Sequence, residues 1–261
     1  MKTNLWGVGL VWLVAVALAW EWGAHLLAVE FHDPMAGSKL PYLHAVVSTM
    51  VENSGVLFEA AEVTFTQAAI GFAMGGLIGY VLAILMSVSR TVERIAFPYL
   101  IVSQMIPVLG LAPIVFNLVR DMNASRMVIA AYITFFPVAA NTLAGFKSVD
   151  DEKRTLMHSY AAGRTTTYLK LMMPFALPPL FAGLKIAAPL SVTASILVDM
   201  LGSKNGIGVK LLYALYGGNM DIFWASVVTS ALLGVASYLA VLGAEKLVVP
   251  WETASGPGDG R

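Results

Sequence analysis

The chain has no cysteine, which excludes disulfides, thiolate metal sites and cysteine nucleophiles. Charge is also scarce: 12% of the 261 residues are charged, against roughly 25% in an ordinary soluble domain. Positive and negative residues balance, so no basic excess points to nucleic acid as a partner. The pattern G-x-x-x-x-G-K-[ST] does not occur, so the chain has no P-loop to hold a nucleotide.

Apolar residues, by contrast, make up 58% of the sequence. Several apolar windows exceed the ~18 residues that mark a spanning helix, so we predict an all-α integral membrane protein. The first window contains Ala17-Leu18-Ala19, which resembles a signal-peptidase site, but apolar residues continue to Val29. This continuation favours a retained span over a cleaved signal. Six spans are predicted at residues 5–28, 62–88, 97–119, 127–146, 174–201 and 222–246.

The segments outside the spans set the predicted orientation. Residues 30–61 are expected to form an external loop and then a short interfacial helix between Tyr42 and Val56, and the Gly-, Ser- and Pro-rich tail to be flexible. With the amino terminus in the cytoplasm, ten lysines and arginines fall inside and five outside, while Lys185 lies near the inner boundary. The bias favours cytoplasmic termini and a cytoplasmic loop at about 150–173.

Enzymatic sites within the membrane are incomplete. The four histidines, His25, His32, His44 and His158, lie outside or at the edges of the long apolar runs, so no metal centre is expected there. A serine protease would need a histidine beside a deep serine such as Ser103. An aspartyl protease would need a second acid facing Asp199. We therefore predict no catalytic residue and no metal site.

Small residues and prolines mark the inner spans. Pro107 and Pro113 are expected to bend the third span and Pro137 the fourth, either near a solute path or for packing alone. A ladder of small residues in the second span predicts close contact with another helix of the chain, with lining of a pathway as the alternative. The ladder consists of Gly71, Gly75, Gly79, Ala83 and Ser87.

Polar residues within spans need a partner or a cavity, so they are candidates for a solute pathway, with bonding between helices as the alternative for each. Because we find no basic residue buried in the spans, the weakly polar interior favours a neutral or aromatic solute. The pathway candidates are Gln67, Gln104, Asn141, Ser191, Ser195 and Asp199.

The cytoplasmic loop is amphipathic. Between Asp150 and Met173 its apolar residues recur on one face of a helix, and Gly163 is expected to divide the run into two short helices. Such a segment either lies in the lipid headgroups or docks into a socket on another protein.

Several stretches, taken in order and spacing, carry a resemblance that covers roughly residues 60–250. They are Ser89–Arg94, Ile106-Pro107 with Leu111–Pro113, Phe135–Pro137 with Asn141-Thr142, Gly145 and Ser148–Asp150, Ala176–Pro178 with Gly183–Lys185, and Gly202–Gly208. Together they resemble the permease subunit of bacterial ABC importers, in the nitrate, sulfonate and taurine branch that also serves thiamine-pyrimidine and riboflavin-type uptake.

The resemblance implies a type I ABC importer permease fold in the bacterial inner membrane, surrounded by lipid. It implies a second permease copy, an extracytoplasmic solute-binding protein, and ATP-binding subunits that hold ATP and Mg²⁺, while this chain binds no cofactor. We expect residues 1–60 to form the first span with its loop, 61–250 the permease core, and 251–261 the tail. A membrane anchor without transport of its own is the alternative.

The family's hallmark is a Glu-Ala-Ala, then a Gly, then a Leu-Pro, on the loop that inserts into the ATPase. Anchored on Pro174, the Glu-Ala-Ala positions fall on Thr155, Leu156 and Met157, so the acidic residue is replaced by threonine. The resemblance therefore assigns coupling to the whole segment. Its members are these three residues, Ala161 or Gly163 at the glycine position, Arg164 and Pro174.

Overall fold

The computed structural model describes residues 5–251, and every regular element in that range is helical. Long apolar runs without turn residues form helices, because in lipid a helix satisfies the hydrogen bonds of its own backbone N–H and C=O groups. The elements are α1 (Leu5–His25) with a π-helical turn η1 (Leu26–Glu30), α2 (Ala36–Lys39), α3 (Leu43–Glu52), α4 (Ser54–Val88), α5 (Arg90–Ser103), α6 (Val108–Val119), α7 (Met122–Lys147), α8 (Asp151–Ser159), α9 (Arg164–Thr167) with η2 (Tyr168–Met172), α10 (Met173–Met200), α11 (Ile207–Tyr216) and α12 (Met220–Val248).

The membrane prediction is confirmed. Within residues 5–251, five helical segments are long and apolar enough to cross a bilayer, and a bent pair raises the number to as many as six. The helix of the first segment continues through Ala17-Leu18-Ala19 to Glu30. The segment from Tyr42 to Val56, where a short interfacial helix is expected, contains α3, and the predicted tail lies almost wholly outside the described range.

The third predicted span, 97–119, is not one continuous helix, and the break is sharper than the expected bend. It consists of α5 and α6, which meet at an angle of 100°. Pro107 has no N–H and disfavours helical backbone at Ile106, so α5 ends at Ser103 and Pro107 becomes the N-cap of α6. This pair therefore forms either a broken span or a re-entrant loop.

The second span begins at Ser54, earlier than the predicted residue 62. At 1.5 Å per residue its 35 residues extend about 52 Å, well beyond the ~30 Å hydrocarbon core. One end of α4 therefore extends past the hydrocarbon, which explains how Glu59 and Glu62 are accommodated in an otherwise apolar helix.

α7 is the central helix, and α4 and α10 pack on it along most of its length. A Cβ added to Gly71, Gly75 or Gly79 would lie within 3.0 Å of a carbonyl oxygen of α7. The small-residue ladder is thus a contact within the chain, as predicted. It permits the close backbone approach on which helix association in lipid depends.

The contact between α7 and α10 is equally close. A Cβ on Gly183 of α10 would lie 2.7 Å from the Pro137 carbonyl oxygen, and one on Gly145 of α7 would lie 2.9 Å from the Cα of Ala176. Glycine on both helices therefore brings α10 against α7 near a proline, and α7 continues helically through Pro137.

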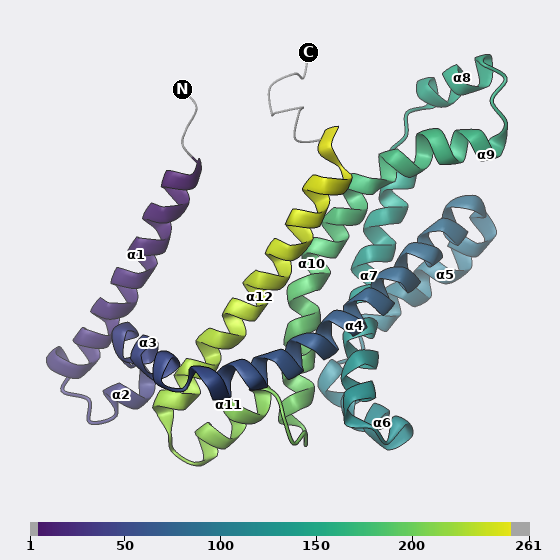
Figure 1. Cartoon of the computed structure of the whole chain (residues 1–261). Coiled ribbons are helices and arrows are strands. Elements are labelled where there is room, and N and C mark those ends of the chain that lie inside the picture. Colours follow the sequence, from purple (N-terminus) through teal and green to yellow (C-terminus); the bar gives the residue numbers. More distant parts are fainter. Residues whose placement is uncertain (1–4, 252–261) are drawn as a thin grey trace.

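The two ends of the bundle differ (Figure 1). The start of α1, the end of α12 and the α8–α9 hairpin lie at one end, which we call the α8–α9 end. The short helices α2, α3, α6 and α11 gather at the other, the α6–α11 end. Near this second end α1 joins the bundle, where Trp20 Nε1 donates to the Pro41 carbonyl at 2.9 Å.

Replacement of Gly75 by alanine is expected to separate α4 from α7 and to destabilise the protein by about 1–3 kcal/mol, because the new methyl group would overlap backbone. The matched control is Gly243→Ala in α12, where an added Cβ meets nothing within 4 Å. Thermal unfolding in detergent measures both. A Gly75→Ala protein as stable as Gly243→Ala would contradict the close contact.

Candidate functional site

A buried ion pair links two spans at the α6–α11 end. Arg126, in the second turn of α7, is 1% exposed, and its Nε lies 2.6 Å from Oδ1 of Asp199 near the end of α10. Arg126 also donates from Nη1 to Asn123 Oδ1 at 2.9 Å and from Nη2 to Ser203 Oγ and the Asn205 carbonyl. One guanidinium therefore joins α7, α10 and the loop that follows α10.

α4 enters the same network through Thr64, which is fully buried. Thr64 Oγ1 donates to Asp199 Oδ2 at 2.6 Å and accepts the backbone N–H of Ile207 at 2.9 Å. The N–H of Gly208 points at the same carboxylate oxygen at 3.4 Å. Asp199 thus faces the amino-terminal end of α11, where a negative charge is stabilised by unpaired N–H groups.

Glycine is required at the residue before α11 and at the second residue of α11. Gly206 has φ +123°, and a Cβ there would overlap the Asp199 carboxylate. A Cβ on Gly208 would overlap the carbonyl oxygen of Ile196. The Gly202–Gly208 stretch that carries part of the family resemblance therefore lets α11 approach α10 closely over Asp199.

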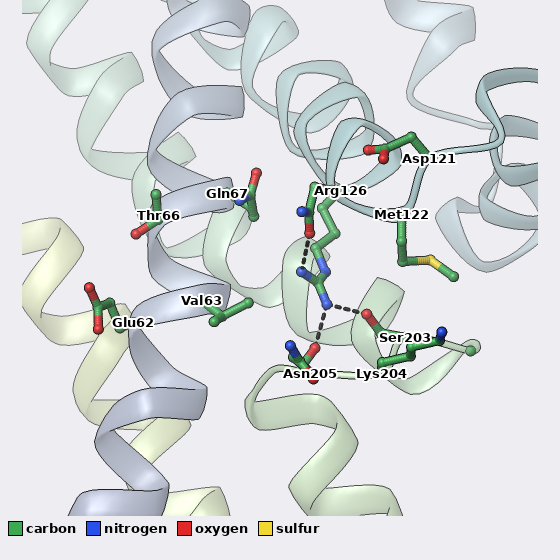
Figure 2. Close-up of a pocket in the computed structure, with 12 residues that line it drawn as sticks. Glu62, Val63, Thr66, Gln67, Asp121, Met122, Arg126, Ser203, Lys204 and Asn205 are labelled. Carbon is green, nitrogen blue, oxygen red and sulfur yellow. Dashed lines mark hydrogen bonds between the residues drawn. The ribbon is translucent and has the colours of Figure 1, made fainter.

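A cavity of about 590 Å³ lies beside this network. Figure 2 shows Val63 and Gln67 of α4 on the side of the cavity that faces Arg126, with Ser203, Lys204 and Asn205 from the loop after α10. Glu62 and Asp121 also line it. Of the predicted pathway candidates, Gln67 is the one that lines this cavity.

The other pathway candidates lie elsewhere. Gln104 is exposed at the break between α5 and α6, and Asn141 donates to the Pro137 carbonyl at 2.8 Å. Ser191 and Ser195 are buried and donate to the carbonyls of Ala188 and Thr64, at 2.8 and 3.3 Å. Asp199 is buried in the ion pair rather than lining the cavity.

The expectation that the spans contain no buried basic residue is wrong. Arg126 lies inside α7, four residues after its start, and was assigned to the outer surface because the apolar run begins just after it. Asp199 is the residue from which a buried cation could have been predicted, because an acid inside a span requires a cationic partner. Lys185, which is predicted to lie near the inner boundary, bonds both carboxylate oxygens of Glu245 near the end of α12 at 2.8 Å.

The predicted coupling segment forms a hairpin at the α8–α9 end. No residue of α8 or α9, both fully described, is buried. Thr155, Leu156 and Met157 lie in α8, Arg164 begins α9, and Pro174 lies in the first turn of α10. Two short helices divided before Arg164 were predicted, and the structure contains them.

The turn between these helices settles which residue has the glycine-like backbone. Ala161 has φ +53°, a left-handed conformation that favours glycine. Gly163 has φ −66°, which any residue adopts. Ala161 is therefore the residue of this turn whose backbone favours glycine, and Gly163 is not.

Three contacts fix the hairpin to the bundle. Arg154 Nη2 donates to the Phe146 carbonyl at the end of α7, at 3.3 Å. The ring of Tyr168 stacks on Phe146 with centroids 5.3 Å apart, and its hydroxyl bonds Ser87 Oγ of α4 at 2.7 Å. α7 therefore runs from the ion pair at one end to the hairpin at the other.

Replacement of Arg126 by methionine should leave Asp199 buried without its cation, at a cost of about 3–5 kcal/mol. The double variant Arg126→Met with Asp199→Leu should recover much of this loss, because no buried charge remains. Arg94→Met, at an exposed arginine, is the control. Thermal unfolding in detergent of the parent, the single variants Arg126→Met and Asp199→Leu, the double variant and the control measures the coupling, and additive losses in the double variant would contradict it.

Ala161→Gly is expected to stabilise the hairpin turn by roughly 1 kcal/mol, because glycine adopts the left-handed backbone without strain. Gly163→Ala should be tolerated, since an added Cβ there meets nothing within 4 Å. Hydrogen exchange of residues 159–167 measures both variants. Faster exchange in Ala161→Gly than in the parent would show that the turn differs from the one described.

The sequence of the chain is similar to those of known proteins. A family model described as "Binding-protein-dependent transport system inner membrane component" matches residues 75–248. A formylaminopyrimidine transport permease protein of Halalkalibacterium halodurans is 27% identical over 241 residues, 92% of this chain and 94% of the relative. A putative aliphatic sulfonates transport permease protein of Escherichia coli is 24% identical over 250 residues, 95% of this chain and 90% of the relative.

The fold is also similar to a solved one. The crystal structure of an amino acid ABC transporter with histidines matches 77% of this chain and 96% of that chain, with a TM-score of 0.59 and 16% identity. The family model covers well over half of the sequence. The chain therefore belongs to the inner-membrane component family of binding-protein-dependent transport systems, and it is the permease subunit of an ABC importer.

Proposed function

We propose that the α8–α9 hairpin is the contact through which the ATP-binding subunit drives this permease. The observation that carries the proposal is the fixation of a hairpin without buried residues to the end of α7 by Arg154 and Tyr168. A push on the hairpin then moves α7, and with it the ion pair at the α6–α11 end, as one body.

The hairpin lacks the family's acidic residue, but acids are close by. Thr155 Oγ1 donates to the carbonyl of Asp151, one turn earlier, and Glu152 is its neighbour in the first turn of α8. Side chains four residues apart share a helix face. The socket on the ATP-binding subunit accordingly meets a hydroxyl at residue 155 and carboxylates one turn away.

The α8–α9 end faces the cytoplasm in this proposal, and both termini with it. Support comes from Arg90, Arg94, Lys147, Lys153 and Arg164, which all lie in helices that begin or end there. ATP and Mg²⁺ are then bound by the partner subunit on that side. The solute-binding protein delivers solute at the α6–α11 end.

A second copy of this chain completes the passage. The cavity beside Arg126 occupies one end of the bundle, so a route across the membrane needs further walls. Exposed apolar side chains of α4, such as Leu77 and Val81, offer a surface for lipid or for the second copy. The anchor alternative is not favoured, because relatives that match nearly the whole chain are transport permeases.

The solute that we propose is small and carries no net negative charge. The named relatives include a formylaminopyrimidine permease and a sulfonate permease, so the family alone does not decide between them. Buried Arg126 would favour an anion if its charge were unpaired. Asp199 neutralises it at 2.6 Å, and the interior therefore remains unsuited to an anion.

Reversal of two charges in the hairpin region, Arg164→Glu with Lys170→Glu, is expected to reduce solute-stimulated ATP hydrolysis by at least about tenfold, the equivalent of 1.4 kcal/mol of coupling. The control, Arg90→Glu with Arg94→Glu, changes the same charge at exposed positions outside the hairpin. ATPase assays on the reconstituted importer with its binding protein measure both. Full stimulation in the first variant would rule out the coupling role.

A further inference from the structure

Beyond the coupling role, we propose that the cavity beside Arg126 is a solute-binding vestibule. It selects uncharged or cationic solutes and excludes anions. The solutes that it favours carry an N–H donor next to an acceptor, as in an amino-substituted heteroaromatic ring. The inference rests on the proposed function, since it takes the α6–α11 end as the side where solute arrives. At about 590 Å³ the cavity has the size of a small-molecule site.

Arg126, in the cavity wall, is not available to bind an anion. Its Nε faces Asp199, Nη1 donates to Asn123, and Nη2 contacts both Ser203 and Asn205. A guanidinium carries five N–H groups. The two Nη atoms use three of them in these hydrogen bonds, and Nε lies in the ion pair with Asp199. Arg126 therefore holds the wall together, and its charge is cancelled by a carboxylate in direct contact.

The remaining charges around the cavity are negative on balance. Glu62 and Asp121 contribute two carboxylates, and Lys204 contributes one exposed ammonium, which leaves one net negative charge (−2 + 1 = −1). Because the Arg126–Asp199 pair is neutral as a whole, it does not reverse this sign. An anion entering the cavity is repelled, and a cation is weakly attracted.

Gln67 gives the cavity its hydrogen-bonding character. It projects from α4 toward the side of Arg126 (Figure 2), and its Oε1 is buried without a partner in the protein. This oxygen is closed to solvent, so a ligand in the cavity reaches it once the carboxamide turns, and the bond then recovers the free energy that an unpartnered carbonyl costs. A carboxamide presents a donor and an acceptor side by side, and a half-turn of its end group exchanges them. An amino group beside a ring nitrogen is the complementary pattern, as in the pairing of glutamine with adenine.

The sign of the charge can be measured without transport. Val63 lines the cavity and is half-buried, and the chain has no cysteine, so Val63→Cys gives this subunit a single thiol. We expect a cationic methanethiosulfonate to react about fivefold faster than an anionic one, relative to their rates with a small free thiol. Glu62→Gln should reduce this preference. Equal or faster reaction of the anionic reagent would overturn the exclusion of anions.

The donor preference is tested by protection of the same thiol in the full importer. 4-Aminopyrimidine should slow its reaction with uncharged N-ethylmaleimide, pyrimidine-4-carboxylate should not, and Gln67→Leu should remove the protection. Protection by the carboxylate, or none by the amine at tens of millimolar, would overturn the proposed class. Neither readout requires ATP. Loss of coupling in the hairpin variant would thus leave this test intact, and failure here would leave the permease function standing.

Discussion

The structure depends on the close approach of α4, α7 and α10. Lipid supplies no hydrophobic drive between helices, so association requires dense backbone packing. The glycine ladder on α4 and the single glycine of α10 provide it, because a Cβ at Gly75 or Gly183 would overlap the backbone of α7. Thr64, Arg126 and Asp199 come from these three helices, so their network forms only when the helices are this close.

The same packing gives the ion pair its role. Two buried charges rarely add stability by themselves, but the loss of either leaves an expensive unpaired charge. The pair therefore acts mainly to fix one arrangement of α7, α10 and the glycine loop before α11. The arginine in the cavity wall is therefore neutralised by its partner. Gln67 and the nearby carboxylates then determine which solutes the cavity binds. α7 extends from this wall to the hairpin, so both ends of the molecule share one rigid element.

The sequence predicts most of the fold because its signals are local. Apolar length places five of the six spans, the ladder at Gly71, Gly75 and Gly79 marks the α4–α7 contact, and the amphipathic run predicts the hairpin. The 100° break between α5 and α6 was expected only as a bend, because Pro107 shows that a helix is interrupted but not in which direction the chain continues. The coupling residues come from the resemblance alone, and the left-handed backbone at Ala161 is a feature that the sequence does not indicate.

The site was harder to predict because its parts are far apart in the chain. Thr64 and Asp199 are separated by 135 residues, and Arg126 and Ser203 by 77. Hydropathy assigned Arg126 to the surface, since nothing local shows that a loop after α10 folds back over it. Gln67 was found as a polar residue in a span. Its place beside a cavity depends on the long-range contacts that sequence periodicity does not contain.

The most direct measurement of the central claim is a cross-link from the hairpin to the ATP-binding subunit. The chain has no cysteine, so Ser159→Cys, exposed at the end of α8, and Tyr216→Cys, 81% exposed at the α6–α11 end, each introduce one thiol. With a short photoactivatable linker, the account predicts that residue 159 joins the ATP-binding subunit and that residue 216 does not. A cross-link to that subunit from residue 216, and none from residue 159, would contradict it.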